Sequence, residues 1–516
     1  MNGYHSLLEI DALTAGGVPE TLRFCCTAGF SGGGHTWHPY IVDPGLIQIN
    51  LFASGKISGP SSYSYGEIII GNKKAPEDLT GPTDWLKGYQ FYGRPVRRYY
   101  GLVTAPFPSG YSLSVANIQN VDPLWDKFSF TLRGRQAELD TPLNTLRFLG
   151  NNVAPDGLEG DASLKDTLKP LLLGRVGREQ AFKPVLCNSS KLIYAVSPAT
   201  GLAVDEMGAD LHVYDSGVEL GYAGKLTLAN LQTTAPPPGQ YYAAAEGYIR
   251  LGSSPAGTIT MSGASAGHAL TSHPAVLITA ALTMAGFNAG DAKDMLDSNS
   301  FTAFADKRER GLYLTQATNI STIIDTLVAP LGWWQFTGPG KLLFGTLVDP
   351  AGLSHIYTVN GATNSKKISF AKTQDTPGGV PAASVSCRIA RNYAVQTDVA
   401  GSVSADRKAW LGQEWRTDSL AAVAPHPLSV DLSFDTALTE AAPEIMTLLQ
   451  ALHTVPRELV LVDIGKKDFP VASTLLPGNL IGVNLQGRFD YSDQTMLLIA
   501  ITSNQRTEAV SLVLWG

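Results

Sequence analysis

Cysteine is scarce in this chain of 516 residues, which contains only Cys25, Cys26, Cys187 and Cys387. These four residues form no Cys-x-x-Cys pair and no framework of close spacings, so we expect no disulfide scaffold. An iron–sulfur cluster needs thiolates that converge from four directions, whereas neighbouring side chains of a strand point to opposite faces. The spacing therefore does not support a cluster, and it predicts buried structural thiols and no cofactor.

Charge is also sparse, at 16% of the residues, with a net charge of −7 and a pI of about 5.7. A nucleic-acid surface needs a local excess of Lys and Arg, so we expect no sequence-specific nucleic-acid partner. The longest apolar run, residues 274–287, is shorter than the roughly 20 residues that cross a bilayer. The N-terminus has no basic stretch before a long apolar run. We expect a soluble protein made in a cytosol, not an integral membrane protein.

Catalytic motifs are missing as well. The chain has no Gly-x-Ser-x-Gly elbow, no His-Glu-x-x-His, no Walker loop, and no glycine fingerprint between a strand and a helix. The acids Glu67, Glu77, Asp78 and Asp84 could pair for sugar hydrolysis, which needs two carboxyl groups about 5 to 9 Å apart. They lie in a turn-rich stretch, however, and we interpret it as a solvated loop. The sequence predicts a protein that is not an enzyme.

The best metal candidates are His35 and His38 in "HTWHP", because His-x-x-His can place two imidazoles on one ion. No third ligand is near them in the sequence. Cys25 and Cys26 are the other weak candidates, for the reason given above. We therefore predict no metal site.

Glycine and proline are plentiful, with 52 Gly and 31 Pro. Such punctuation, about every six residues, is typical of many short strands joined by turns. The length predicts about three or four domains. The expected fold class is mainly β with α+β insertions, built from several small antiparallel sandwich-like or barrel-like domains.

Changes in the pattern predict five segments along the chain. Residues 150–180 should contain a short helix-like stretch, three helices should follow later, and the C-terminus should form a hairpin around "SNQRTE". The expected segments are an N-terminal β domain (1–155), a second β domain (156–265), an α+β domain with helices near 273–287 and 319–330 (266–370), a β segment with a helix near 439–453 (371–455), and a small C-terminal β domain (456–516).

The stretch "FYGRPVRRYYG" at 91–101 gathers aromatic rings and arginines. It raises three hypotheses: a nucleic-acid clamp, a sugar-stacking platform, or part of a β scaffold. Because the chain is acidic overall, we interpret it as a hairpin whose rings pack in a sheet and whose arginines are solvated or bind carboxylates.

Several blocks of sequence, in order, resemble the tail-tip proteins of long-tailed bacteriophages and prophages. Each block is a strand with a turn, and their succession covers most of residues 40–516. The blocks are "SYSYGEIIIGNKKAPEDLTGPTDWLKGYQFYGRPVRRYYG" (62–101), "VYDSGVEL" (213–220), "GQYYAAAEGYIRLGSSPAGTIT" (239–260), "GLYLTQATNISTIIDTLVAPLGWWQFTGPGKLLFGTL" (311–347), "ARNYAVQTDVAGSV" (390–403) with "WLGQEWR" (410–416), and the closing "VSLVLWG".

The resemblance implies a virion structural protein at the distal end of a flexible, non-contractile tail, assembled in the cytoplasm of the host bacterium. As a baseplate hub it would form a ring that connects the tail tube to the tail fibres and opens for DNA ejection. Its implied partners are further copies of itself, the tail tube, the tape measure protein, and fibre or central tip proteins. A trimer is expected for a hub, and a hexamer is the alternative for a distal tail ring.

Aromatic residues within these blocks are candidates for core packing or for interface anchors. The candidate binding or interface residues are Tyr63, Tyr65, Trp85, Tyr92, Arg94, Trp333, Trp334, Trp410 and Trp415. One alternative function is a host-glycan-binding tail-tip module, in which Tyr63, Tyr65, Trp85, Tyr89, Tyr92 and Tyr99 would lie exposed in a row. The other is a cell-wall hydrolase, which needs a cleft with paired carboxylates.

Overall fold

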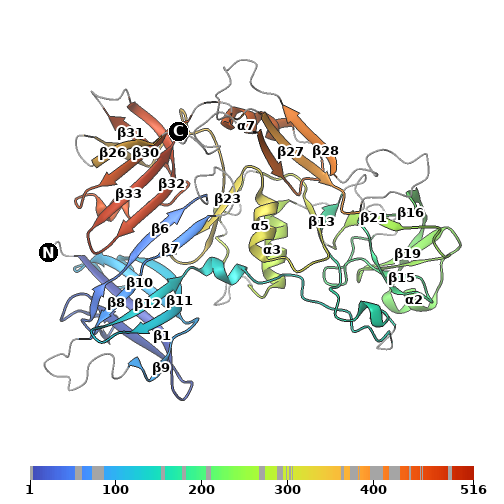
Figure 1. The fold of residues 1–516 in the computed structure, drawn as a ribbon, viewed down its shortest axis with the longest axis horizontal. Helices are drawn as coiled ribbons and strands as arrows, with labels where there is room; N and C mark the ends of the chain where they lie inside the picture. The colour runs from blue at the N-terminus through green and yellow to red at the C-terminus, as the bar shows by residue number, and fades with distance from the viewer. Residues whose placement is uncertain are drawn as a thin grey trace.

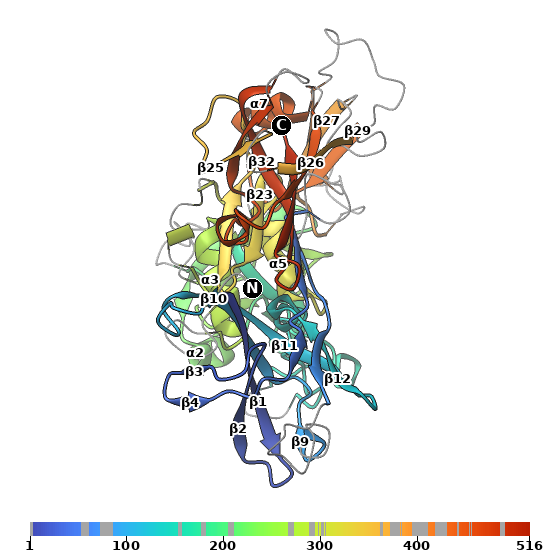
Figure 2. The ribbon, with the colours of Figure 1, turned by 90° about the vertical axis from the view of Figure 1, so that its left-hand side faces the viewer.

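The computed structural model of the chain consists mainly of β-strands in several sheets, with helices between them (Figure 1, Figure 2). This confirms the predicted mainly β fold class. No helix in the part of the chain that is described reaches the length and apolar character of a membrane span. The structure describes residues 4–52, 61–72, 86–152, 157–176, 182–204, 211–266, 273–287, 295–297, 299–300, 304, 306–361, 365–371, 382, 384–394, 411–417, 431–440, 443–453, 455, 457–485 and 491–516.

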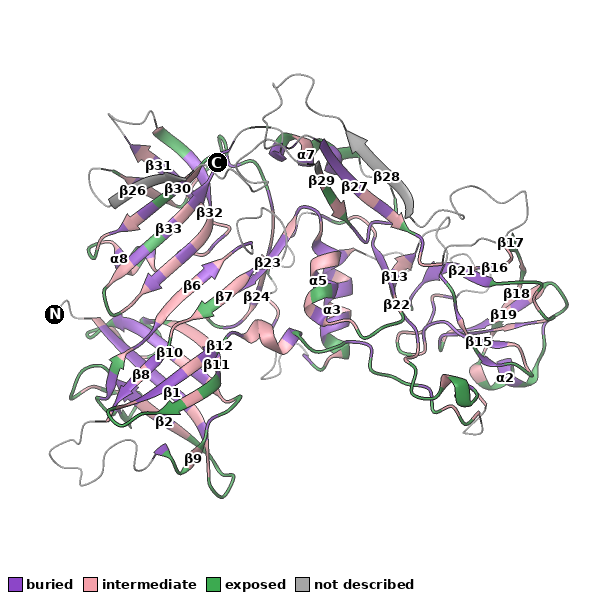
Figure 3. Ribbon diagram, viewed as in Figure 1, coloured by how far each residue is buried: buried purple, intermediate pink, exposed green. Residues whose placement is uncertain are grey.

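The N-terminal sheet lies at the lower left of Figure 1 and is antiparallel. Its strands alternate between buried and less buried positions (Figure 3), which is the period-two pattern of a sheet that covers a core on one face. That core contains Leu8, Ile10, Phe24, Phe91 and Phe130. In spatial order the strands are β2 (Pro19–Cys25), β1 (Tyr4–Thr14), β10 (Pro95–Leu102), β11 (Tyr111–Pro123), β12 (Lys127–Arg133), β8 (Ile68–Gly71) and β5 (Ile41–Asp43), with β9 (Tyr89–Gln90) beside β1; the short hairpin of β3 (Ser31–Gly32) and β4 (His35–Thr36) is separate.

The C-terminal sheet lies above the N-terminal sheet in Figure 1. Its last two strands form the predicted hairpin around "SNQRTE", with Asn504 opposite Ala509. In spatial order the strands are β25 (Tyr357–Asn360), β31 (Leu480–Leu485), β32 (Tyr491–Asn504), β33 (Ala509–Trp515), β30 (Leu459–Ile464) and β26 (Ser365–Ala371), and β32 also pairs with β6 (Leu46–Asn50), which pairs with β7 (Ser62–Tyr65).

Strands β6 and β7 therefore join the C-terminal sheet although they lie early in the sequence. The chain leaves the N-terminal sheet after β5, forms β6 and β7, and returns as β8. Gly45 and Gly66 mark the two crossings. A Cβ atom on Gly45, which has φ +75°, would lie 2.8 Å from the Gly66 carbonyl oxygen, so only glycine allows the two passes to lie this close.

Helices fill the centre of the molecule. The predicted helices at 273–287 and 319–330 are confirmed as α3 (Pro274–Met284) and α5 (Ile320–Val328), which lie side by side (Figure 1). Pro274 opens α3, where its missing N–H costs no hydrogen bond. Residues Ile320, Ile323, Ile324 and Leu327 of α5 are buried, as a 3.6-residue period requires. Beside them lie the hairpin of β23 (Gly332–Phe336) with β24 (Leu342–Thr346) and the 3₁₀ helix η2 (Arg135–Leu139).

Two further sheets lie at the right of Figure 1. The β13 sheet has the order β17 (Val218–Glu219), β16 (His212–Asp215), β21 (Ile259–Ala264), β13 (Leu171–Val176) and β22 (Gly311–Leu314). The β15 sheet has the order β14 (Val185–Asn188), β15 (Ile193–Ala195), β20 (Tyr248–Leu251), β19 (Gln240–Ala244) and β18 (Gly221–Leu226), and α2 (Leu228–Thr233) contacts it.

Two sequence predictions in this region were wrong. Where 150–180 was expected to contain a helix-like stretch, its described residues form the 3₁₀ turn η3 (Ala162–Leu164) and then strand β13. Because β13 is buried on both faces, its sequence LLLGRV shows no alternation, and such a short apolar run does not distinguish strand from helix. Helix α2 also precedes the three predicted helices, and its Thr227 cap accepts a hydrogen bond from the Asn230 amide.

The last sheet, the β27 sheet, has the order β28 (Leu411–Thr417), β27 (Ser384–Arg391) and β29 (Asp431–Asp435). Helix α7 (Pro443–His453) packs on it, and the short α8 (Phe469–Ala472) lies against the C-terminal sheet. Helix α7 starts four residues after the predicted 439, because Pro443 opens it.

Three strand pairs among the described residues are parallel, namely β18–β19, β25–β31 and β27–β29. The five predicted domain segments stay a prediction.

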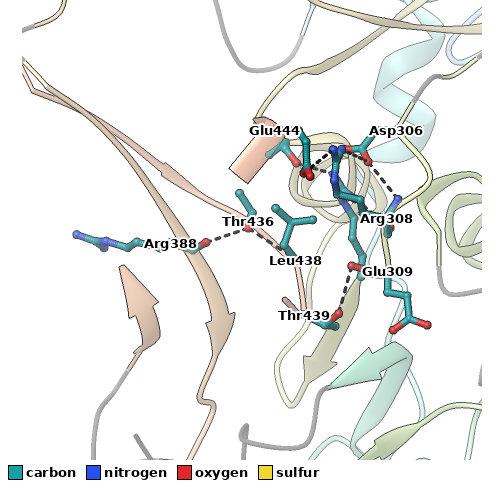
Figure 4. Close-up of polar contacts among 10 residues, drawn as sticks. Asp306, Arg308, Glu309, Arg388, Thr436, Leu438, Thr439 and Glu444 are labelled. Carbon is teal, nitrogen blue, oxygen red and sulfur yellow. Dashed lines mark hydrogen bonds and ion pairs between the residues drawn. The ribbon is translucent and has the colours of Figure 1, made fainter. Parts of the chain in front are cut away.

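The β27 sheet docks on the central layer through polar contacts (Figure 4). Arg308 contacts Asp306 at 3.2 Å and Glu444 of α7 at 3.3 Å. Beneath them, the fully buried Arg310 donates from Nη2 to Asp306 Oδ2 at 2.6 Å and to the Ala329 carbonyl oxygen at 3.0 Å. The Arg308–Glu444 pair thus links residues 306–310 to α7, the helix that packs on the β27 sheet.

A buried histidine at the end of α7 makes the folded chain sensitive to acid. His453 is 2% exposed and lies beside Phe434, with ring centroids 5.7 Å apart. Burial, helped by the positive charge of Arg457, lowers the pKa of His453 from 6.5 to about 4.

Between pH 4 and 6.5, His453 therefore binds a proton in the unfolded chain but stays neutral in the folded chain. Its contribution to the unfolding free energy is complete above about pH 6.5 and falls as the pH drops. We expect a change from pH 7 to pH 5 to remove roughly 2 kcal/mol of unfolding free energy through this group, measured by urea denaturation. His453→Gln should lose most of this pH dependence and the exposed His35→Gln should keep it. Equal acid sensitivity in His453→Gln and the native chain would contradict the assignment.

Candidate functional site

The "FYGRPVRRYYG" stretch forms the turn before β10 and most of β10 itself, which pairs with β1 and β11. Of its three arginines, Arg97 binds carboxylates, which is one of the two environments expected from the sequence. Arg97 donates from Nη2 to Asp11 Oδ1 at 2.6 Å and from Nε to Glu9 Oε2 at 3.0 Å, and Arg23 reaches Glu9 Oε1 at 2.9 Å. Burial alone would raise the pKa of Asp11, but the hydrogen bond from Arg97 holds it below its usual value.

The other two arginines bind backbone carbonyl oxygens, and the rings of Phe91, Tyr99 and Tyr100 are buried, whereas Tyr92 is exposed. Arg94 donates from Nε to the Asp11 carbonyl oxygen at 3.1 Å, and Arg98, 2% exposed, donates to the Gly45 carbonyl oxygen at 3.0 Å. Tyr100 stacks on Tyr4 at 5.3 Å and meets Phe469 of the C-terminal sheet edge-on at 5.2 Å. The stretch therefore joins the two large sheets and presents no clamp to a nucleic acid.

The candidate aromatic residues do not form an exposed row. Tyr63 and Tyr65 of β7 are half-buried and stack at 6.3 Å, and Tyr65 donates to the Val115 carbonyl oxygen at 3.3 Å. Tyr99 is buried, whereas Tyr92 is 67% exposed. Tyr89 is half-buried and bonds Glu20. Trp85 and Trp410 lie outside the described residues, and of Trp415 only the backbone is described, in β28 opposite Cys387. The described residues thus give little support to a glycan platform.

Trp333 and Trp334 are core residues on opposite faces of β23. The Trp334 indole donates to Asp325 Oδ1 at 2.6 Å within the core around α3 and α5. The Trp333 indole lies between two glycines, because a Cβ on Gly345 would come within 2.1 Å of its ring and one on Gly478 within 2.5 Å. Gly478 belongs to the C-terminal region, so Trp333 fixes the central hairpin to that sheet.

The candidate metal ligands do not converge. Cys25 is buried, Cys26 is exposed, and the other two cysteines lie in different sheets, Cys187 in β14 and Cys387 in β27. His35 and His38 are both exposed. Among the described residues, no group of three or more His, Cys, Asp or Glu side chains could hold an ion.

Of the carboxylates considered for hydrolysis, Glu67 alone lies within the described residues. Glu67 accepts a hydrogen bond from the Ser129 hydroxyl at 3.1 Å. Glu77, Asp78 and Asp84 lie outside the described residues.

A cleft of about 850 Å³ lies between β22, β14 and α5. We call it the β22 cleft and define it by Leu164, Lys183, Leu186, Leu312, Leu314 and Arg391. The described residues that line it include leucines, threonines and the cations Lys183 and Arg391, but no Asp or Glu. This cleft lacks the paired acids that sugar hydrolysis requires.

Trp125, the most exposed tryptophan of the described residues, was not among the candidates predicted from the sequence. Trp125 is 97% exposed at the turn between β11 and β12, and its neighbour Leu124 is 46% exposed. We call residues 122–127 the Trp125 tip. The pattern "DPLWDK" was a usable signal, because an Asp-Pro turn with an apolar pair and a second Asp places large side chains where a turn is solvated.

Comparison with solved structures finds matches along almost the whole chain. The prophage MuSo2 43 kDa tail protein from Shewanella oneidensis is 7% identical, with 99% of this chain and 98% of that chain covered and a TM-score of 0.40. The tail protein from Neisseria meningitidis MC58 is also 7% identical, with 99% and 96% covered and a TM-score of 0.40. Prophage tail protein gp18 from Listeria monocytogenes EGD-e is 8% identical, with 99% and 94% covered and a TM-score of 0.37.

These matches are phage tail proteins. They belong to the class that the sequence blocks resemble. TM-scores below 0.5 do not establish a shared fold, so no property of these proteins is transferred to this chain. No protein-family model matches the chain, and no curated protein matches it by sequence.

The packing of the Trp333 indole against Gly345 and Gly478 should contribute strongly to the unfolding free energy. We expect Trp333→Ala to lower the unfolding free energy by about 3 to 5 kcal/mol, because it leaves a large cavity between two sheets. Trp125→Ala, which removes the same side chain from an exposed turn, should change it by less than about 0.5 kcal/mol. Urea denaturation of both variants measures this, and similar losses in the two would refute the burial of Trp333.

The cysteines should differ sharply in reactivity. Burial raises the pKa of Cys25 and Cys387 to about 11 and of Cys187 to about 12, and the thiolate is the form that reacts. In the folded protein we expect a thiol reagent to modify Cys26 first, with the other three reacting only after denaturation. Cys26→Ser should abolish the fast phase, and a fast phase that persists in this variant would contradict the placement.

Proposed function

We propose that this chain is a non-enzymatic structural protein of a phage tail tip, a baseplate hub whose copies close into a ring. The ring connects the tail tube to the tail fibres and opens for DNA ejection. One observation carries the proposal: the N-terminal and C-terminal sheets are joined side by side through β6, β7 and Tyr100. Each copy thus contributes two rigidly linked sheets, which is what the wall of a ring that continues the tail tube requires.

The low charge and the sheet edges support the same function. The edge strands β2, β5, β25 and β26 would be covered by neighbouring copies or by other tail proteins, because uncovered edges invite unspecific pairing. A net charge of −7 suits a lumen through which DNA passes without being held. The ordered succession of sequence blocks, described above, supports the position at the distal end of the virion tail.

The ring would act mechanically. Contacts between copies hold the tip closed, and receptor contact through the fibres shifts the population toward an open state. A trimer is the expected assembly and a hexamer the alternative, with the tail tube, tape measure and fibre or central tip proteins as partners.

Gold-labelled antibody against the chain, applied to purified particles, tests the proposal. We expect label at the host-facing end of the tail, and light scattering of the purified chain should give a multiple of 54.9 kDa, with three as the expected factor. Particles that lack the chain at that end would overturn the proposal, and so would its hydrolysis of peptidoglycan in a zymogram.

A further inference from the structure

The Trp125 tip is held in a fixed shape. The Leu124 amide donates to the Lys127 carbonyl oxygen at 2.8 Å and closes the turn. Asn72, at the end of β8, donates from its side chain to the Trp125 carbonyl oxygen at 3.0 Å and from its amide to the Asp126 carbonyl oxygen at 2.9 Å. A contact made by such a preorganised turn loses little conformational entropy on binding.

The tip also combines apolar area with negative charge. Trp125 and Leu124 stand between two exposed acids, Asp122 and Asp126. A tryptophan buries up to about 250 Å² in a contact and is among the residues most enriched at the centres of interfaces. The partner that fits this tip is an apolar pocket with positive charge at its rim.

The β22 cleft has that complementary chemistry. Leu312 and Leu314 come from β22, an edge strand of the β13 sheet, and Leu186 from β14, an edge strand of the β15 sheet. Lys183 is exposed at the cleft, and the Arg391 guanidinium lies over the Tyr393 ring at 5.0 Å. The volume of about 850 Å³ is large enough for an indole and a leucine side chain.

We propose that the Trp125 tip of one copy inserts into the β22 cleft of the next copy. The N-terminal sheet and the cleft-bearing sheets lie at opposite ends of the molecule (Figure 1), so the tip is offered to another copy. Such a head-to-tail contact joins two different surfaces and closes into a ring when the rotation permits. This inference rests on the proposed function and names the surfaces that build its ring.

A pair of tip variants tests the contact by the mass of the assembly at a series of concentrations. Trp125→Ala should weaken assembly at least about 30-fold, as loss of an interface hot spot does. Tyr92→Ala removes another exposed aromatic ring, one that has no acidic neighbour in its turn, and should leave assembly unchanged. Equal assembly by Trp125→Ala and the native chain would overturn the inference.

Charge reversal tests the orientation of the contact. Lys183→Glu and Asp126→Lys should each weaken assembly, and the double variant should assemble better than either single one, because the ion pair is restored with opposite polarity. Double-variant assembly no better than that of the weaker single variant would count against the pairing.

Cross-linking decides between this contact and any other use of the tip. In a Cys26→Ser background, a mixture of Leu124→Cys chains, which keep the Trp125 ring, and Leu186→Cys chains should form a disulfide-linked dimer under mild oxidation, and Leu124→Cys mixed with Val218→Cys, an exposed position away from the cleft, should not. If no dimer forms with Leu186→Cys, the inference is overturned. This holds even if Trp125→Ala weakens assembly, because the tip then contacts another surface. Antibody labelling at the tail end tests the proposed function separately, so the proposed function and the proposed contact can each be contradicted without the other.

Discussion

The molecule depends on two neighbouring tryptophans that face opposite ways. In strand β23 the side chains alternate, so Trp334 completes the core around α3 and α5 and Trp333 enters the core shared with the C-terminal sheet. The same hairpin reaches the N-terminal sheet at its tip, where the Val115 amide donates to the Gly338 carbonyl oxygen at 2.8 Å and Arg135 donates to that of Gly340 at 2.8 Å. One short hairpin thus fixes three parts of the chain relative to one another.

The crossing of β6 and β7 adds a second constraint of the same kind. Both strands come from the N-terminal part of the sequence, and β6 pairs with β32 while β7 pairs with β6. The two large sheets therefore cannot separate without breaking this hydrogen-bond ladder. Several strand pairs, among them β1–β10, β30–β33 and β6–β32, join residues far apart in the sequence, which is a slow way to fold but yields sheets that cannot slide independently. The role proposed for this chain would benefit from such rigidity.

The parts that sequence reasoning predicted are the local ones. The C-terminal hairpin and helices α3 and α5 follow from turn residues and a 3.6-residue period within a short window. The exchange of β6 and β7 has no local signal, because their partner β32 lies about 450 residues away. For the same reason the sequence left the arginines at 91–101 as either solvated or bound to carboxylates, and it could not name Glu9 and Asp11 as the partners of Arg97. The turn residues around Trp125 indicate a solvated turn, but how far it protrudes depends on the assembled sheet.

A buried cation restricts the movement of the parts at the Gly45 crossing. Arg98 lies beneath this crossing, and burial lowers its pKa to about 10, so it stays charged at neutral pH. A shift at the crossing would take the buried Arg98 guanidinium away from the carbonyl oxygen that it binds, at a cost of several kcal/mol. Apolar packing alone would tolerate small sliding motions there, whereas Arg98 penalises them. If copies assemble into the proposed ring, its opening is therefore expected between copies and not at this crossing within a copy.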